Sequence, residues 1–108
     1  MILLKTTIYT TANGKQPFAS WLNSLDIAVQ QIVLARIDRV RHGLLGDCKS
    51  VSDGVFELRI QYGAGYRVYF GMRQRVLVVL LVGGDKAGQR GDIIKAKRYW
   101  AEYKETNK

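Results

Sequence analysis

The chain has 108 residues and a formal net charge of +8, from 17 Lys and Arg against 9 Asp and Glu. Hydrophobic residues make up 47% and charged residues 24%, a composition that is typical of a globular domain and excludes an intrinsically disordered chain. No apolar run approaches the roughly 20 residues that a membrane-spanning helix needs. The excess of positive charge indicates a polyanionic partner, most often a nucleic acid.

Cysteine and histidine are each present once, as Cys48 and His42. A lone cysteine cannot form an internal disulfide, and a lone histidine leaves little from which to build a metal site. The first residues lack the basic segment and the long apolar segment of a signal peptide. We therefore expect a single domain over residues 1–108 that is cytoplasmic and uses neither a metal nor a cofactor.

The first half of the chain predicts one strand followed by two helices. Residues 2–9 are rich in β-branched and aromatic side chains, which favours a strand. Pro17 suits the first position of a short helix with apolar residues at helical spacing. Asp26 can cap a second helix, which Gly43 and Gly46 should end. The apolar stripe of that helix consists of Val29, Val33, Ile37, Val40 and Leu44.

The second half changes to the two-residue period of β-strands. Residues 55–61 and 65–71 alternate, whereas residues 76–82 are apolar throughout, as in a strand covered on both faces. After a glycine-rich loop, Asp92 can cap a last helix. The predicted fold class is α+β, in the order β-α-α-β-β-β-α. We expect an antiparallel sheet with helices packed mainly on one face.

The hairpin between residues 55–61 and 65–71 sets which side chains share a face. A two-residue loop would pair core residues with polar ones, whereas a three-residue loop at 63–65 pairs Ile60 with Val68. That register places Arg59 opposite Tyr69 and Gln61 opposite Arg67. The predicted polar face then consists of Glu57, Arg59, Gln61, Arg67 and Tyr69.

Two arginines beside a tyrosine are a suitable surface for RNA. Guanidinium groups pair with phosphate through two hydrogen bonds, and a tyrosine ring can stack on an unpaired base. Lys86 should lie nearby, because the apolar strand leads directly into its loop. The alternative also stands, since the open face of an antiparallel sheet ordinarily presents polar side chains to water.

Three segments resemble those of a known family when they are considered together. They are Val55–Ile60, Gly65–Phe70 and Gly83–Lys86, followed by Gln89 and Asp92. This combination resembles the RelE/ParE toxin superfamily, in particular the small HigB-like "addiction module killer protein" branch. The length and the order of elements match as well, so the resemblance spans nearly the whole chain.

The resemblance implies the toxin of a type II toxin–antitoxin pair. It implies a ribosome-dependent, metal-independent endoribonuclease that cleaves mRNA with the 2′-hydroxyl as nucleophile. Arg59, Arg67 and Lys86 match the catalytic cations of this family. The candidate RNA-binding residues are Gln61, Tyr69, Gln89 and Arg90. The implied partners are the ribosome, mRNA and a cognate antitoxin, expected to be a helix-turn-helix protein that alone contacts operator DNA; no membrane is involved.

These patterns do not assign the residues that act as general acid and general base. Relatives often carry a tyrosine or histidine near the start of the last helix, where this chain has Asp92, and His42 is remote in sequence. Asp92 and Glu57 are the candidates, although Asp92 is also an ordinary helix cap and a cationic neighbour would leave Glu57 weakly basic. Lys86 could act as the base only if nearby arginines lowered its pKa. Two other functions remain: a ParE-like DNA gyrase poison, and a catalytically degenerate protein that binds its antitoxin and helps repress the operon.

Overall fold

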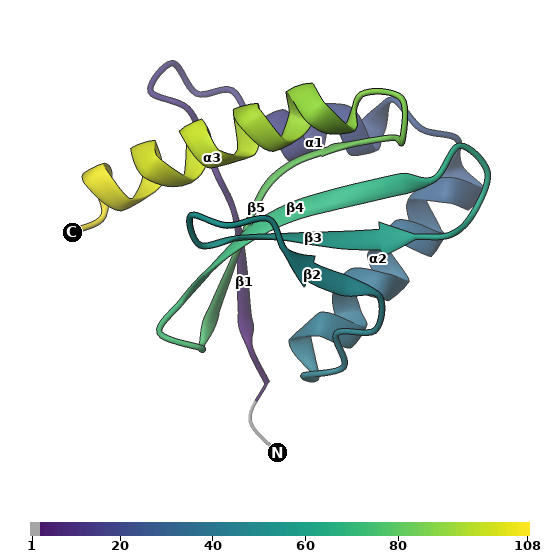
Figure 1. The fold of residues 1–108 in the computed structure, drawn as a ribbon, viewed down its shortest axis with the longest axis horizontal. Helices are drawn as coiled ribbons and strands as arrows, with labels where there is room; N and C mark the ends of the chain where they lie inside the picture. The colour runs from purple at the N-terminus through teal and green to yellow at the C-terminus, as the bar shows by residue number, and fades with distance from the viewer. Residues whose placement is uncertain (1–2) are drawn as a thin grey trace.

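The computed structural model describes residues 3–108 and consists of a five-stranded sheet with helices against both faces (Figure 1). The predicted α+β fold class is confirmed. The elements in chain order are β1 (Lys5–Ile8), α1 (Pro17–Asn23), α2 (Ile27–Arg41), β2 (Cys48–Ser50), β3 (Val55–Ile60), β4 (Tyr66–Arg73), β5 (Leu77–Gly84) and α3 (Gln89–Thr106). None of the helices within residues 3–108 is long and apolar enough to cross a membrane.

Two features of the sheet differ from the prediction. The strand order is β1-β5-β4-β3-β2, and β1 runs parallel to β5, with Thr6 opposite Val78. The short strand β2, which the sequence analysis missed, pairs antiparallel with β3. A pairing between strands so far apart in sequence leaves no local pattern, and three residues are too few to display a period. The predicted strand at residues 2–9 is shortened to Lys5–Ile8, and residue 2 lies outside the described residues.

The core has two layers, one on each side of the sheet. On one side α1 and α2 bury Phe18 and Val33 against Leu58 and Phe70 of the sheet. On the other side α3 buries Trp100 in a second cluster. The prediction of helices mainly on one face therefore holds for α1 and α2, whereas α3 crosses the opposite face (Figure 1). The strand β5 is covered on both faces, as its apolar sequence predicts.

A glycine on β4 allows α3 to lie close to the sheet. A Cβ atom at Gly71 would come within 2.3 Å of Cε3 of Trp100, so any larger residue there must push the helix outward. Trp100 is 4% exposed and is the largest side chain that α3 buries. The approach of Trp100 to Gly71 therefore fixes the height of α3 above β4 and β5.

The helix starts agree with the sequence in two cases out of three. Pro17 occupies the first position of α1, and Asp26 precedes α2, although its side chain makes no capping hydrogen bond. The predicted cap of the last helix is wrong, because α3 begins at Gln89 and Asp92 lies within its first turn. Asp85 accepts a hydrogen bond from the Gly88 amide (3.1 Å), so the chain turns into the helix earlier than expected. Of the predicted α2 stripe, Leu44 lies beyond the helix and is exposed.

Candidate functional site

The β3–β4 hairpin is closed by residues 61–65, a longer loop than the predicted three residues. Its register pairs Ile60 with Tyr66, Arg59 with Arg67 and Glu57 with Tyr69. The predicted register is therefore wrong by two residues. A shift of two keeps every side chain on its own face, so the alternation that guided the prediction could not distinguish the two registers. In the observed register the two arginines lie directly opposite each other.

Two like charges on opposing strand positions repel each other, and a buried carboxylate compensates for this repulsion. The Glu57 side chain is fully buried, with its Oε1 2.9 Å from Nε of Arg59 and its Oε2 3.6 Å from Nε of Arg67. A buried charge is tolerated when it is paired and hydrogen-bonded. Glu57 is thus the residue that holds the two guanidinium groups side by side.

Two neutral side chains complete the surroundings of this carboxylate. The Tyr69 hydroxyl donates to Oε2 of Glu57 (2.9 Å), and the Gln89 amide donates to the same oxygen (2.8 Å). Tyr69 belongs to β4 and Gln89 to the first turn of α3. One carboxylate therefore connects β3, β4 and α3 at the end of the sheet that carries the arginines.

The hydrogen bonds determine the charge states of these groups. Burial alone raises the pKa of Glu57, but the hydrogen bonds from Arg59, Gln89 and Tyr69 outweigh it and hold that pKa below its usual range. The hydrogen bond to Glu57 raises the pKa of Arg59, while burial and the bond to Glu57 raise the pKa of Tyr69. At neutral pH the cluster holds two cations, one anion and a neutral tyrosine. Glu57 has no exposed surface from which to accept a substrate proton, so its geometry favours a positioning role.

The cations border a groove of about 380 Å³, which we call the arginine groove. Its lining consists of Arg59, Ile60, Gln61, Tyr62, Gly63, Gly65, Tyr66, Arg67 and Lys86. The three cations that the sequence analysis grouped are thus brought together. Arg67 donates from Nη1 to the Gly65 carbonyl (2.8 Å), and its side chain is only 11% exposed, against 32% for Arg59. Arg67, which the sequence placed on the exposed polar face, is therefore mostly buried.

The other predicted RNA-binding residues have different surroundings. Gln61 lines the groove and donates to Oδ2 of Asp47 (2.8 Å). Tyr69 is fully buried, so its predicted exposure is wrong and its ring cannot stack on a base. The reason is that α3 covers this part of the face. Gln89 is engaged with Glu57, and Arg90 is exposed but does not line the groove.

The second candidate acid or base, Asp92, also lies outside the groove lining. Its carboxylate is so close to the backbone of Gly84 that a Cβ atom there would come within 1.9 Å of Oδ2. Burial raises the pKa of Asp92, partly offset by Lys95. Within residues 3–108, no three His, Cys, Asp or Glu side chains are clustered in a way that could hold a metal ion.

Sequence reasoning missed the aromatic side of the groove. Tyr62 and Tyr66 both line it, although the sequence pattern predicts neither as a site residue. The available signal was the position of Tyr62 in a loop with two glycines, two residues after the end of the strand that carries Arg59. A second basic hollow, lined in part by Arg36 and Arg39, shares Arg59 and Gln61 with the arginine groove.

Comparison with known proteins gives two findings. The profile of a family described as "Phage derived protein Gp49-like (DUF891)" matches residues 20–100. An "Uncharacterized protein" of Haemophilus influenzae is 47% identical over 97 residues, which cover 89% of this chain and 90% of that protein. The match to the family includes the whole lining of the arginine groove, together with Glu57 and Gln89.

Proposed function

This chain belongs to the phage-derived Gp49-like family, a RelE/HigB-like toxin family, and on that basis we propose that it is the toxin of a type II toxin–antitoxin pair and cleaves mRNA on the ribosome. The observation that carries the proposal is the pair of opposed arginines, Arg59 and Arg67, with Lys86 on the same groove. A buried carboxylate holds the arginines before any substrate arrives, which is the preorganisation that electrostatic catalysis requires.

In the proposed reaction a ribose 2′-hydroxyl attacks the adjacent phosphorus. The O2′–P bond forms, the P–O5′ bond breaks, and the products are a 2′,3′-cyclic phosphate and a 5′-hydroxyl. Arg59 and Arg67 stabilise the charge that develops on the non-bridging oxygens. The 2′-hydroxyl releases its proton to water, and the leaving 5′-oxygen gains one. Lys86 lines the groove with an ammonium group that can supply the second proton, whereas Glu57 and Asp92 do not line it.

The proposed partners follow from the same assignment. The ribosome and mRNA are the substrate complex, and a cognate antitoxin of the helix-turn-helix type neutralises the toxin and contacts operator DNA. Arg36 and Arg39 of α2 lie outside the arginine groove and are available for binding ribosomal RNA.

The test is induction of the chain in a bacterial host without the antitoxin, followed by primer extension on translated messages. We expect growth arrest and new 5′ ends within coding regions. Arg67→Ala should lower cleavage by about a hundredfold or more, because it removes a preorganised cation. Arg98→Ala, which removes an exposed arginine from α3, is the matched control and should retain cleavage.

Since Arg67 is mostly buried, the folding of the Arg67→Ala variant must be checked separately. Arg67→Lys keeps a cation near Glu57 but loses the planar fork, so it should fold and still cleave poorly. Circular dichroism and thermal melting report the fold of each variant. Growth arrest with intact messages would rule out the proposal, and gyrase-linked DNA breaks in that case would favour the ParE-like alternative.

A further inference from the structure

An exposed tyrosine ring borders the arginine groove. Tyr62 is 51% exposed and lines the groove with Arg59, Arg67 and Lys86. It is the one tyrosine among the large apolar side chains that are well exposed within residues 3–108. An exposed ring beside three cations is a combination that neither the fold nor the core requires.

Every other tyrosine already has a structural role. Tyr69 is buried on Glu57, and Tyr66 packs edge-on against Trp21 with ring centroids 6.5 Å apart. Tyr9 stacks on Tyr99 at 5.1 Å, and Tyr103 stacks on Trp100 at 5.6 Å. Of the two tyrosines that line the groove, Tyr62 is therefore the more exposed one, and its ring packs on no other aromatic ring within residues 3–108.

Hydrogen bonds within the loop order the backbone of Tyr62. The Tyr62 amide donates to the Ile60 carbonyl (2.9 Å), and the Gly65 amide donates to the Tyr62 carbonyl (3.1 Å). Gly63 has a φ of +55° and stands beside the Tyr66 ring, where an added Cβ would lie 3.4 Å from Cε2. The left-handed backbone at Gly63 favours glycine, and a side chain there would press against the Tyr66 ring.

We propose that Tyr62 stacks on a base of the nucleotide whose phosphate contacts Arg59 and Arg67, so that the arginine groove takes single-stranded RNA with an unstacked base. The inference rests on the proposed function for the identity of the phosphate. A base within a duplex is paired and stacked and cannot offer its face to a side chain, whereas an unpaired base can. The sequence of the RNA matters little to such a contact, because every base has a stacking face.

The experiment measures binding of fluorescein-labelled oligouridylate to the purified chain by fluorescence anisotropy, without ribosomes. Tyr62→Ala should weaken binding by roughly tenfold or more, while Tyr62→Phe, which keeps the ring, should stay within about twofold. The slope of log affinity against log salt should be the same for all three proteins, because the phosphate contacts are unchanged.

An abasic ribose–phosphate chain of equal length is the control ligand. The difference between wild type and Tyr62→Ala should vanish on it, because it carries the phosphates without the bases. The inference is overturned if wild type does not bind oligouridylate, if Tyr62→Ala binds it as tightly as wild type, or if the abasic chain shows the same loss.

The readout also distinguishes this inference from the proposed function. If wild type cleaves messages but Tyr62→Ala binds oligouridylate as tightly as wild type, only the stacking role is overturned. If Tyr62→Ala loses affinity for oligouridylate but not for the abasic chain, and wild type cleaves no messages in cells, the proposed function is overturned and the stacking contact stays in place. If Tyr62→Ala weakens the hold on a protein antitoxin but leaves RNA affinity unchanged, the surface serves the antitoxin instead.

Discussion

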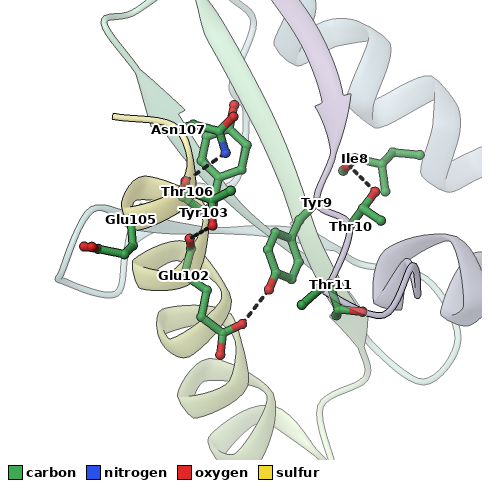
Figure 2. Close-up of a pocket in the computed structure, with 10 residues that line it drawn as sticks. Ile8, Tyr9, Thr10, Thr11, Glu102, Tyr103, Glu105, Thr106 and Asn107 are labelled. Atoms are coloured by element: carbon green, nitrogen blue, oxygen red, sulfur yellow. Dashed lines mark hydrogen bonds between the residues drawn. The ribbon is translucent and has the colours of Figure 1, made fainter.

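Two tyrosine–glutamate hydrogen bonds lie near opposite ends of α3, and their surroundings differ. Near its N-terminus, Tyr69 donates to Glu57, whose side chain is fully buried between two arginines. Near its C-terminus, Tyr9 donates to Glu102, whose side chain is 52% exposed (Figure 2). The same pair of groups positions two cations near one end of α3 and joins the buried Tyr9 to α3 near the other. Burial makes the difference, since exposed charges are screened by water and salt.

The hollow beside the second pair has a different chemistry from the arginine groove. It has a volume of about 540 Å³ and is bordered by the end of β1, the residues that follow it and the last turns of α3. Figure 2 shows the Tyr9 hydroxyl pointing at the Glu102 carboxylate. The charged residues in its lining are Glu102 and Glu105, which repel phosphate. The net charge of +8 is therefore unevenly distributed, and the larger hollow is the one less suited to a polyanion.

The largest expected effect comes from removing the two carboxylates in turn. Glu57→Ala should lower the free energy of unfolding by about 3–5 kcal/mol, because it leaves two arginines without their buried partner. Glu102→Ala should cost less than about 1 kcal/mol, as for an exposed pair. Chemical denaturation of both variants gives the comparison. Equal losses would show that the buried carboxylate has no special role.

A smaller effect is expected from removing the two hydroxyl groups. Tyr69→Phe deprives a buried carboxylate of one donor and should cost about 1.5–3 kcal/mol, as for a hydrogen bond to a charged group. Tyr9→Phe should cost about 1 kcal/mol or less, because water can replace the donor on Glu102. The unfolding midpoints of both variants measure this. A larger loss in Tyr9→Phe would reverse the ranking of the two pairs.

The pH dependence of stability is the smallest expected effect, and it can be measured only in acid or in alkali. The pKa of Glu57 lies below its unfolded value, so Glu57 stabilises the fold above roughly pH 4 and this stabilisation is lost as the pH falls through the folded pKa. Burial, the hydrogen bond to Glu102 and the charge of Glu102 raise the pKa of Tyr9 to about 12, so its contribution is present below roughly pH 10 and disappears as the pH rises toward 12.

Melting temperatures across pH for two variants separate these contributions. Glu57→Gln should flatten the acid side of the stability profile and leave the alkaline side unchanged. Tyr9→Phe should flatten only the alkaline side between about pH 10 and 12. A change on the same side in both variants would contradict the assignment of the two pairs.

The local patterns of the sequence predicted much of this molecule correctly. The unbroken apolar run of residues 76–82 identified a strand covered on both faces, and the stripe from Val29 to Val40 identified the buried side of α2. The grouping of Arg59, Arg67 and Lys86 was also correct, because strand alternation and a short connection bring them together whichever hairpin register is adopted. These inferences depend on residues close to one another in the chain.

Contacts between distant residues decided the rest. The sequence by itself determined which residues share a face of the hairpin and that this face is basic. Only the tertiary structure decided that Arg59 stands opposite Arg67, since a shift of two residues preserves both faces. It also decided that α3 crosses this face, held close by Trp100 on Gly71, and so buries Glu57 and Tyr69 while leaving the arginine groove open. No local period encodes where a distant helix will lie, because its position depends on packing across the whole sheet.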